Sequence, residues 1–194
     1  VTRGSKVSHL DDAKGRSAKR KARNVLFVCS GNVFRSVSAE RILKARVSSE
    51  AVPAGLSVGS AGTHAVPQLV RPEVAECLAR YRIAVADHMP RRVDAAMLDE
   101  IDLVVSMSYD HRSFLKERFG RQSMLFNEIA VGADTPILDV GEATPPWRDD
   151  PVVAAAHATR VIDYLWEVMP QFLDNLGAAL SGNDRDSVAA SGAA

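Results

Sequence analysis

Short apolar runs alternate with amphipathic segments along most of the chain. The runs are short and rich in branched side chains, which is typical of buried strands. They lie at residues 25–28, 56–60, 101–107 and 123–126. Strands that alternate with helices along a chain form a parallel sheet covered by helices on both faces. The pattern therefore predicts an α/β fold of three layers, in which a four-stranded parallel sheet is flanked by helices.

The amphipathic segments carry apolar residues on one helical face and polar residues on the other. The helices predicted in this way cover residues 37–49, 73–81, 95–98, 109–119 and 152–180. Pro170 lies inside the last of them, where it is expected to kink or split the helix. Residues 131–151 have little periodicity and many Gly, Pro and Asp residues, so we expect a long functional loop there.

The length of 194 residues fits one domain with tails. We expect the domain to cover residues 24–180. Residues 1–23 are predicted to form a basic, disordered extension, and residues 181–194 a disordered tail. The formal net charge is zero, and no apolar run is long enough for a membrane span, so we expect no nucleic acid partner and no membrane insertion. Two cysteines do not make a disulfide framework and suit a reducing cytoplasm.

Cys29 ends the first predicted strand, and Arg35 follows it after five residues. Ligands bind at the carboxyl ends of the strands in such sheets, so this loop lies where a ligand would bind. Backbone amides of residues 30–36 at a helix start can hold phosphate oxygens, and Gly31 and Asn32 permit a tight turn. Arg35 can grip two oxygens with its planar guanidinium. The same positive field favours the thiolate of Cys29, which could accept a phosphoryl group without a metal or cofactor.

Residues 24–40, NVLFVCSGNVFRSVSAE, resemble the signature of the low-molecular-weight protein tyrosine phosphatases. Later segments are similar too and keep the order of that family, including Asp150 and Pro151 before the last helix. The resemblance extends over residues 24–176. It implies the same fold, a four-stranded parallel sheet flanked by helices, and a phosphatase that works through a cysteinyl-phosphate intermediate.

The resemblance also implies a role for each residue of the loop. Cys29 would be the nucleophile and Arg35 the phosphate clamp, and Ser36 would donate a hydrogen bond to the sulfur. Ser36, Ser60 and His88 would hold Asn32 in a strained conformation. The substrate phosphate would bind to Ser30, Gly31, Asn32, Val33, Phe34, Arg35 and Ser36.

A poor leaving group needs a proton, and the resemblance assigns the general acid and base to Asp150. Pro151 can start the last helix and fix the residue before it, which favours Asp150 over its competitors Asp149 and Asp139.

The substrate is less well specified than the reaction. Members of the family that act on phosphotyrosine have aromatic side chains along the cleft. This chain has His-Ala-Val at residues 64–66 and Val-Val at residues 152–153 in the corresponding places. Phe34 or Trp147 could take over the contact with a phenyl ring. Val33 resembles the tyrosine branch more than the arginine-phosphate branch, which tends to have Thr there. We therefore expect a phosphorylated protein, most simply phosphotyrosine, as the partner.

Three alternatives fit parts of the same pattern. A small phosphomonoester could replace the phosphoprotein as substrate. Arsenate is shaped like phosphate, so a small-thiol-dependent arsenate reductase would need only Cys29. A non-catalytic phosphate-binding module is the third alternative, and it is disfavoured because a cysteine, an arginine and an Asp-Pro pair are all present.

Overall fold

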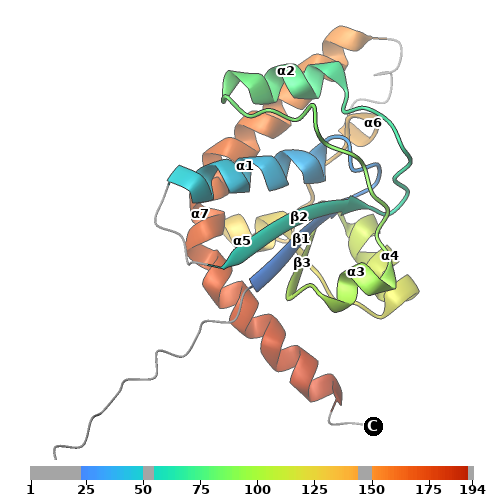
Figure 1. Cartoon of the computed structure of the whole chain (residues 1–194), viewed down its shortest axis with the longest axis vertical. Helices are drawn as coiled ribbons and strands as arrows, with labels where there is room; N and C mark the ends of the chain where they lie inside the picture. The colour runs from blue at the N-terminus through green and yellow to red at the C-terminus, as the bar shows by residue number, and fades with distance from the viewer. Residues whose placement is uncertain (1–22, 50–54, 144–149, 192–194) are drawn as a thin grey trace, which may run out of the picture.

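The computed structural model describes residues 23–49, 55–143 and 150–191. Four parallel strands form one sheet in the order β2-β1-β3-β4, and helices cover both of its faces, which confirms the predicted fold class (Figure 1). The strands are β1 (Arg23–Cys29), β2 (Leu56–Gly62), β3 (Leu103–Ser106) and β4 (Met124–Leu125). Residues 1–22 lie outside the described part, so the basic extension stays a prediction.

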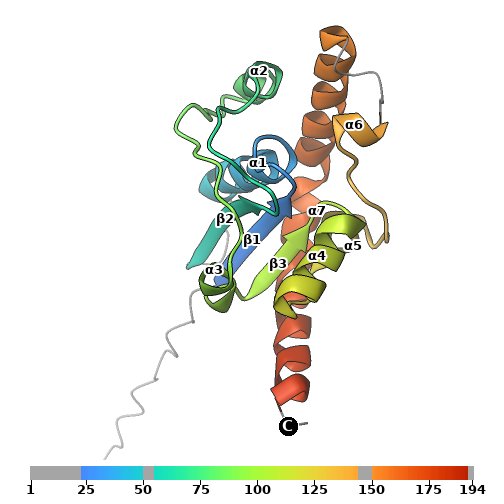
Figure 2. The ribbon, with the colours of Figure 1, turned by 90° about the vertical axis from the view of Figure 1, so that its right-hand side faces the viewer.

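Alternate residues of β1 point into the two halves of the core. Val25 and Phe27 pack in the larger cluster, against α1 (Arg35–Ser49), α2 (Pro72–Arg80), α5 (Phe126–Val131) and α7 (Pro151–Ser191). Leu26 and Val28 pack in a smaller cluster with residues of α3 (Ala95–Asp99) and α4 (Tyr109–Phe119). Figure 2 shows these two groups of helices on opposite faces of the sheet. Both faces of β1 are therefore covered, as its continuous apolar sequence requires.

The strand register brings distant residues to one edge of the sheet. Cys29 at the end of β1 is paired with Gly62 of β2, and Val28 is paired with Ser106 of β3. The segments that follow these strand ends lie side by side, because parallel strands end at the same edge. The register thus places the loop after Cys29 beside residues that follow Gly62 and Ser106.

Part of the predicted loop at residues 131–151 is helical in the described structure. Helix α5 begins at Phe126, where an apolar strand was expected to end. The Glu128 side chain accepts the Leu125 amide at 2.7 Å and so caps the helix. β4 is therefore shorter than predicted. A further turn, α6 (Val140–Ala143), forms in the middle of the segment. Residues 144–149 lie outside the described part.

The last helix runs through Pro170 without interruption and continues to Ser191, beyond the predicted end of the domain at residue 180. Proline has no amide hydrogen to give to the carbonyl of Trp166, one turn earlier. Arg46 of α1 supplies the missing donor, with Nη2 at 3.1 Å from the Trp166 oxygen, and its guanidinium also lies 3.8 Å from the Trp166 ring centre. A tertiary contact therefore replaces the lost helical bond, and the predicted split does not occur. Among the described residues, no helix is both long and apolar enough to cross a membrane.

Candidate active site

The loop of residues 29–36, called the cysteine loop below, joins the end of β1 to the start of α1 (Figure 1). Gly62 of the neighbouring strand touches it directly. A Cβ atom at Gly62 would lie 2.5 Å from the Ser30 carbonyl oxygen, so a larger residue could not stand there without a shift of the backbone. The Thr63 amide donates to the Cys29 carbonyl at 2.9 Å, and the His64 amide donates to that of Ser30 at 2.9 Å. β2 therefore supports the loop as well as pairing with β1.

Asn32 adopts the left-handed conformation, with φ 55°, and is fully buried. Its side-chain amide donates to Ser36 Oγ at 3.0 Å and to Ser60 Oγ at 2.8 Å. Its side-chain oxygen accepts the Arg91 amide at 3.1 Å, and its carbonyl lies 2.8 Å from His88 Nε2. Left-handed backbone is costly for a residue with a side chain, so contacts within the loop and from two other segments, β2 and residues 88–91, hold the turn in place.

The Cys29 thiol lies inside this turn and is only 2% exposed. The Asn32 amide donates to Sγ at 3.3 Å, and Ser36 Oγ lies 3.0 Å away. Two hydrogen-bond donors can therefore stabilise a negative sulfur. These contacts are the ones expected for a thiolate nucleophile, whereas the catalytic roles of Cys29, Ser36, Ser60 and His88 stay predictions.

Arg35 opens α1, and its side chain is the largest fully buried one, at 1% exposure. Nη2 lies 2.6 Å from Asp139 Oδ2 and 3.4 Å from Ser30 Oγ. Nη1 donates to the Ile137 carbonyl at 3.0 Å and lies 3.3 Å from Glu142 Oε2. Within the described part of the chain, the buried Nε has no hydrogen-bond partner. Arg41, Arg112 and Arg121 also have a buried Nε without a partner in the described part, so the position of Arg35 in the cysteine loop, and not the unpaired atom alone, indicates a place for an anionic ligand.

The partners of Arg35 come from residues 132–143, called the acidic segment below. Several contacts fix this segment: the Ile137 amide donates to the Met107 carbonyl at 2.8 Å, and Tyr109 Oη donates to the Asp134 carbonyl at 2.6 Å. His157 Nε2 lies 3.1 Å from the Leu138 carbonyl. The segment that was predicted to be a loop is thus bound to α4, α7 and the cysteine loop.

The structure separates the three candidates for the general acid. Asp139 contacts Arg35, whereas Asp150 is exposed at the start of α7, where its Oδ1 accepts the amides of Val152 and Val153 at 3.0 and 3.2 Å. Asp150 is therefore an N-cap, and none of its hydrogen bonds in the described part reaches the cysteine loop. Asp149 lies outside the described residues. The sequence favours Asp150 because it precedes Pro151, and its role as the general acid stays a prediction.

His111 is a site residue that the sequence interpretation missed. It lies in the first turn of α4, is 2% exposed, and its Nε2 is 2.9 Å from Ser30 Oγ. Its Nδ1 accepts the Ser108 amide at 3.1 Å, which caps α4. Burial and the nearby Arg35 lower the pKa of His111 to about 3. The only signal in the sequence was its position three residues after the expected cap Ser108, where capping side chains occur.

Of the two aromatic side chains proposed for the cleft, the structure describes one, Phe34, and this one is buried. Phe34 is 4% exposed and packs edge-on against His157, with ring centres 6.1 Å apart. His64 is exposed, as predicted, and its ring lies 5.5 Å from that of Phe114. Trp147 lies outside the described residues. Cys77 is buried on α2, as expected for a core cysteine.

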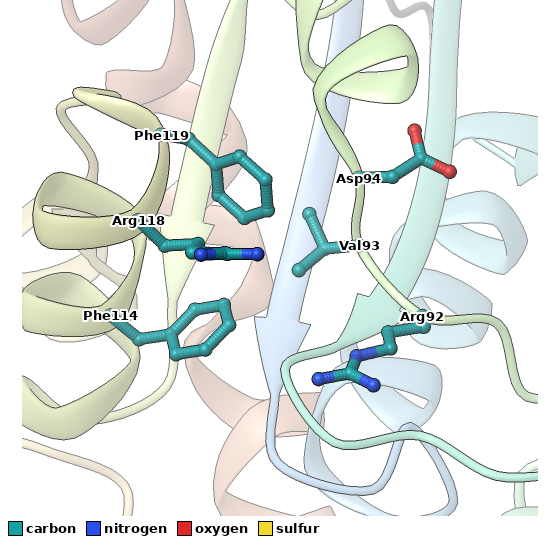
Figure 3. A pocket seen from close by; sticks show the side chains of 6 residues that line it. All are labelled: Arg92, Val93, Asp94, Phe114, Arg118 and Phe119. Carbon is teal, nitrogen blue, oxygen red and sulfur yellow. The ribbon is translucent and has the colours of Figure 1, made fainter.

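A hollow of about 310 Å³ lies between α4 and residues 92–94. Figure 3 shows Phe114, Arg118 and Phe119 on one side of it, with Arg92, Val93 and Asp94 on the other. Its lining contains neither Cys29 nor Arg35, so it is separate from the cysteine loop. No group of His, Cys, Asp or Glu residues within the described part of the chain could hold a metal ion.

Comparisons with known proteins show what this chain is similar to. The family of low molecular weight phosphotyrosine protein phosphatases matches residues 24–142. A protein-arginine-phosphatase of Bacillus subtilis is 29% identical over 120 residues, which are 60% of this chain and 78% of that protein. The low molecular weight protein-tyrosine-phosphatase PtpB of Staphylococcus epidermidis is 30% identical over 118 residues, which are 59% and 78%.

Solved structures are similar over a larger part of the chain. A mutant of YwlE from Bacillus subtilis superimposes with a TM-score of 0.69 at 26% identity, over 80% of this chain and 99% of that one. A YwlE arginine phosphatase mutant with a phosphorylated active-site serine has a TM-score of 0.68 at 25% identity, over 79% and 95%.

Proposed function

Because the chain belongs to the low molecular weight phosphotyrosine protein phosphatase family and is a phosphatase of that family, we propose that it hydrolyses phosphotyrosine in proteins. The reaction would pass through a phosphoryl group on Cys29, with Asp139 as general acid and base. The observation that carries the proposal is the buried Arg35, whose unpaired Nε belongs to the same loop as a thiol with two hydrogen-bond donors.

Substrate binding would change the partners of Arg35. A phosphate that binds with two oxygens uses Nε and Nη2 of the guanidinium, since these atoms form one fork. Nε is free to bind, whereas Nη2 contacts Asp139 at 2.6 Å. A phosphoryl group would therefore replace Asp139 on Nη2 and leave the carboxyl group next to the bound phosphate.

Two chemical steps would follow. Once the phosphate has displaced it from Arg35, Asp139 takes up a proton from the solvent. The Cys29 thiolate attacks phosphorus, the bond from phosphorus to the leaving oxygen breaks, and Asp139 gives this proton to that oxygen. A water molecule then attacks the phosphocysteine and loses its proton to Asp139, while the departing sulfur accepts a hydrogen bond from Ser36, 3.0 Å away. Inorganic phosphate and the free thiolate result. A thiolate of this kind requires a reducing compartment, so we propose the cytoplasm as the location.

Asp139 is preferred to Asp150 because Asp139 lies 2.6 Å from Nη2 of Arg35, whereas Asp150 caps α7.

Phosphoarginine is the second candidate substrate. Its support comes from the arginine phosphatase of Bacillus subtilis and from the carboxylates of Asp139 and Glu142 at Arg35. Two carboxylates suit a guanidinium leaving group, which is cationic. The apolar Val33 in the loop supports phosphotyrosine, because a phenyl ring gains from apolar contact.

The test compares two peptides of one sequence that carry either phosphotyrosine or phosphoarginine. We expect kcat/KM to be higher for phosphotyrosine, and we expect Cys29→Ser to abolish turnover of both peptides and of p-nitrophenyl phosphate. Mass spectrometry after an acid quench should detect a phosphoryl adduct on the Cys29 peptide. A higher kcat/KM for phosphoarginine would replace the substrate assignment, and full activity of Cys29→Ser would overturn the mechanism.

A further inference from the structure

The Ser30 hydroxyl lies between two groups of the site. Its oxygen is 3.4 Å from Arg35 Nη2 and 2.9 Å from His111 Nε2. A hydroxyl has one hydrogen to donate and two lone pairs that accept. Which of these roles Ser30 performs depends on whether His111 Nε2 carries a hydrogen.

The other ring nitrogen of His111 answers that question. Nδ1 lies 3.1 Å from the Ser108 backbone nitrogen, and an amide N–H can only donate. Nδ1 therefore accepts and carries no hydrogen in this arrangement. His111 is almost completely buried and lies close to the Arg35 cation, which favours the neutral ring. A neutral imidazole keeps one hydrogen, which must be on Nε2.

Ser30 Oγ thus accepts from His111 Nε2, and it also accepts from Arg35 Nη2, which is always a donor. Both lone pairs of Ser30 Oγ are used as acceptors, and its hydroxyl hydrogen remains available for donation. Among the described residues, the structure shows no hydrogen bond from this hydroxyl to a further acceptor, and Ser30 is only half-buried. An anion on the Arg35 fork would lie within its reach.

We propose that His111 is a positioning residue, which fixes the Ser30 hydroxyl as a donor to an oxygen of the bound phosphoryl group. This role rests on the proposed function, because Arg35 must hold the phosphate. His111 itself touches no reacting atom and acts only through Ser30. The interaction would stabilise the bound phosphate and the phosphoryl group in transfer.

A double-mutant cycle tests this coupling with the complete chain. The variants are Ser30→Ala, His111→Ala and the two together. The measurements are the affinity for inorganic phosphate, by titration calorimetry, and kcat/KM for p-nitrophenyl phosphate. A hydrogen bond to a charged oxygen contributes about a tenfold effect, so each single change should lower both quantities by about tenfold. The double variant should also lose about tenfold and not a hundredfold, because His111 acts through Ser30.

Two further variants separate positioning from loss of structure. His111→Gln keeps an acceptor for the Ser108 amide and a donor for Ser30, so it should recover most of the loss. Glu117→Gln changes an exposed residue of the same helix, α4, and should leave phosphate affinity and turnover unchanged. If His111→Ala does not fold, Ser30→Ala decides the question, because it removes a single oxygen.

The proposal is overturned if Ser30→Ala binds phosphate and turns over substrate as the wild type does. It is also overturned if His111→Ala causes the same loss in both backgrounds, because His111 would then act independently of Ser30. A different result would contradict the proposed function: a wild-type protein that binds phosphate but does not hydrolyse aryl phosphate. In that case the phosphate affinities of the double-mutant cycle would still test the coupling of Ser30 and His111.

Discussion

The cysteine loop and the acidic segment meet at Arg35, but different forces hold them in place. The turn at Asn32 is held by short hydrogen bonds to Ser36 and Ser60, which are fully buried neutral groups. The acidic segment also has neutral hydrogen bonds, to Met107, Tyr109 and His157. Its acidic side chains, by contrast, form partly exposed ion pairs. Asp139 and Glu142 contact Arg35, and Asp134 lies 3.5 Å from Arg112, which also contacts Glu128 of α5 at 2.7 Å.

This difference shows which part of the site is preformed. Buried neutral hydrogen bonds are insensitive to salt and are costly to break, so the cysteine loop keeps its conformation before any ligand binds. Partly exposed ion pairs contribute little and are screened. Arg35 belongs to both regions, and only its contacts with the acidic segment need to change when phosphate arrives. The predictions below test this division, starting with the largest expected effect.

Replacing the shared residue should have the largest effect. Arg35→Lys keeps the charge but removes the planar fork and the unpaired Nε, so we expect kcat/KM for p-nitrophenyl phosphate to fall about a thousandfold. Circular dichroism should show that the variant is folded. A loss of kcat/KM of less than tenfold would show that a positive charge alone is sufficient to bind the phosphate and that the two guanidinium nitrogens are not both needed.

The acid assignment predicts opposite results for two aspartates. Asp139→Asn should lower kcat for phenyl phosphate about a hundredfold, with a smaller loss for p-nitrophenyl phosphate, whose better leaving group needs less protonation. Asp150→Ala should leave both values unchanged and cost about 1 kcal/mol of unfolding free energy, because it removes a helix cap. If Asp150→Ala instead lowered kcat for phenyl phosphate more than for p-nitrophenyl phosphate, Asp150 would be the general acid.

The buried turn can be weakened without touching the charges. Asn32→Ala removes the side-chain bonds to Ser36 and Ser60 and leaves an alanine in left-handed backbone, so we expect a loss of about 3 kcal/mol in urea unfolding. Asn32→Gly is the matched control, because it loses the same bonds but tolerates the backbone, and it should lose about 1 kcal/mol less. Equal losses would mean that backbone strain plays no part.

The stability of the site should depend on pH through His111. Burial and Arg35 lower its pKa to about 3, His64 adds to this shift, and Asp139 opposes it. The unfolded chain titrates this group near ~6.5, so it binds a proton that the folded chain does not bind between these values. The stability that His111 contributes is therefore complete above pH ~6.5 and is lost as the pH falls toward about 3.

Between pH 7 and pH 5, the wild type should lose about 2 kcal/mol more than His111→Gln, as measured by urea unfolding at both values. The variant is the control, since all other titrating groups are common to the two proteins. If the two proteins lost the same unfolding free energy between pH 7 and pH 5, His111 would take up its proton in the folded state over the same range as in the unfolded chain.

The smallest effect is expected in the acidic segment. Arg112→Gln removes the contacts with Glu128 and Asp134 and should cost less than about 1 kcal/mol at low salt and less still at high salt. Its affinity for inorganic phosphate should equal that of the wild type. A loss that is independent of salt would place this segment in the same class as the buried turn.

The strand, the cysteine loop and the following helix could be predicted from the sequence because they are contiguous. Residues 25–36 carry the apolar run, the turn-forming residues and the arginine in one stretch, so local preferences decide their conformation. The end of β4 and the beginning of α5 could not be predicted in this way. There, the capping contact of Glu128 ended an apolar run that looked like a longer strand.

The sequence by itself determined the α/β architecture and the place of Cys29 and Arg35 in one loop, because both depend on neighbours in the chain. Only the tertiary structure brought Asp139 to Arg35, 104 residues away, and His111 to Ser30, 81 residues away. The register of the parallel strands brings these segments to one edge of the sheet. No pattern along the chain records that register, which follows from packing both faces of the sheet at once.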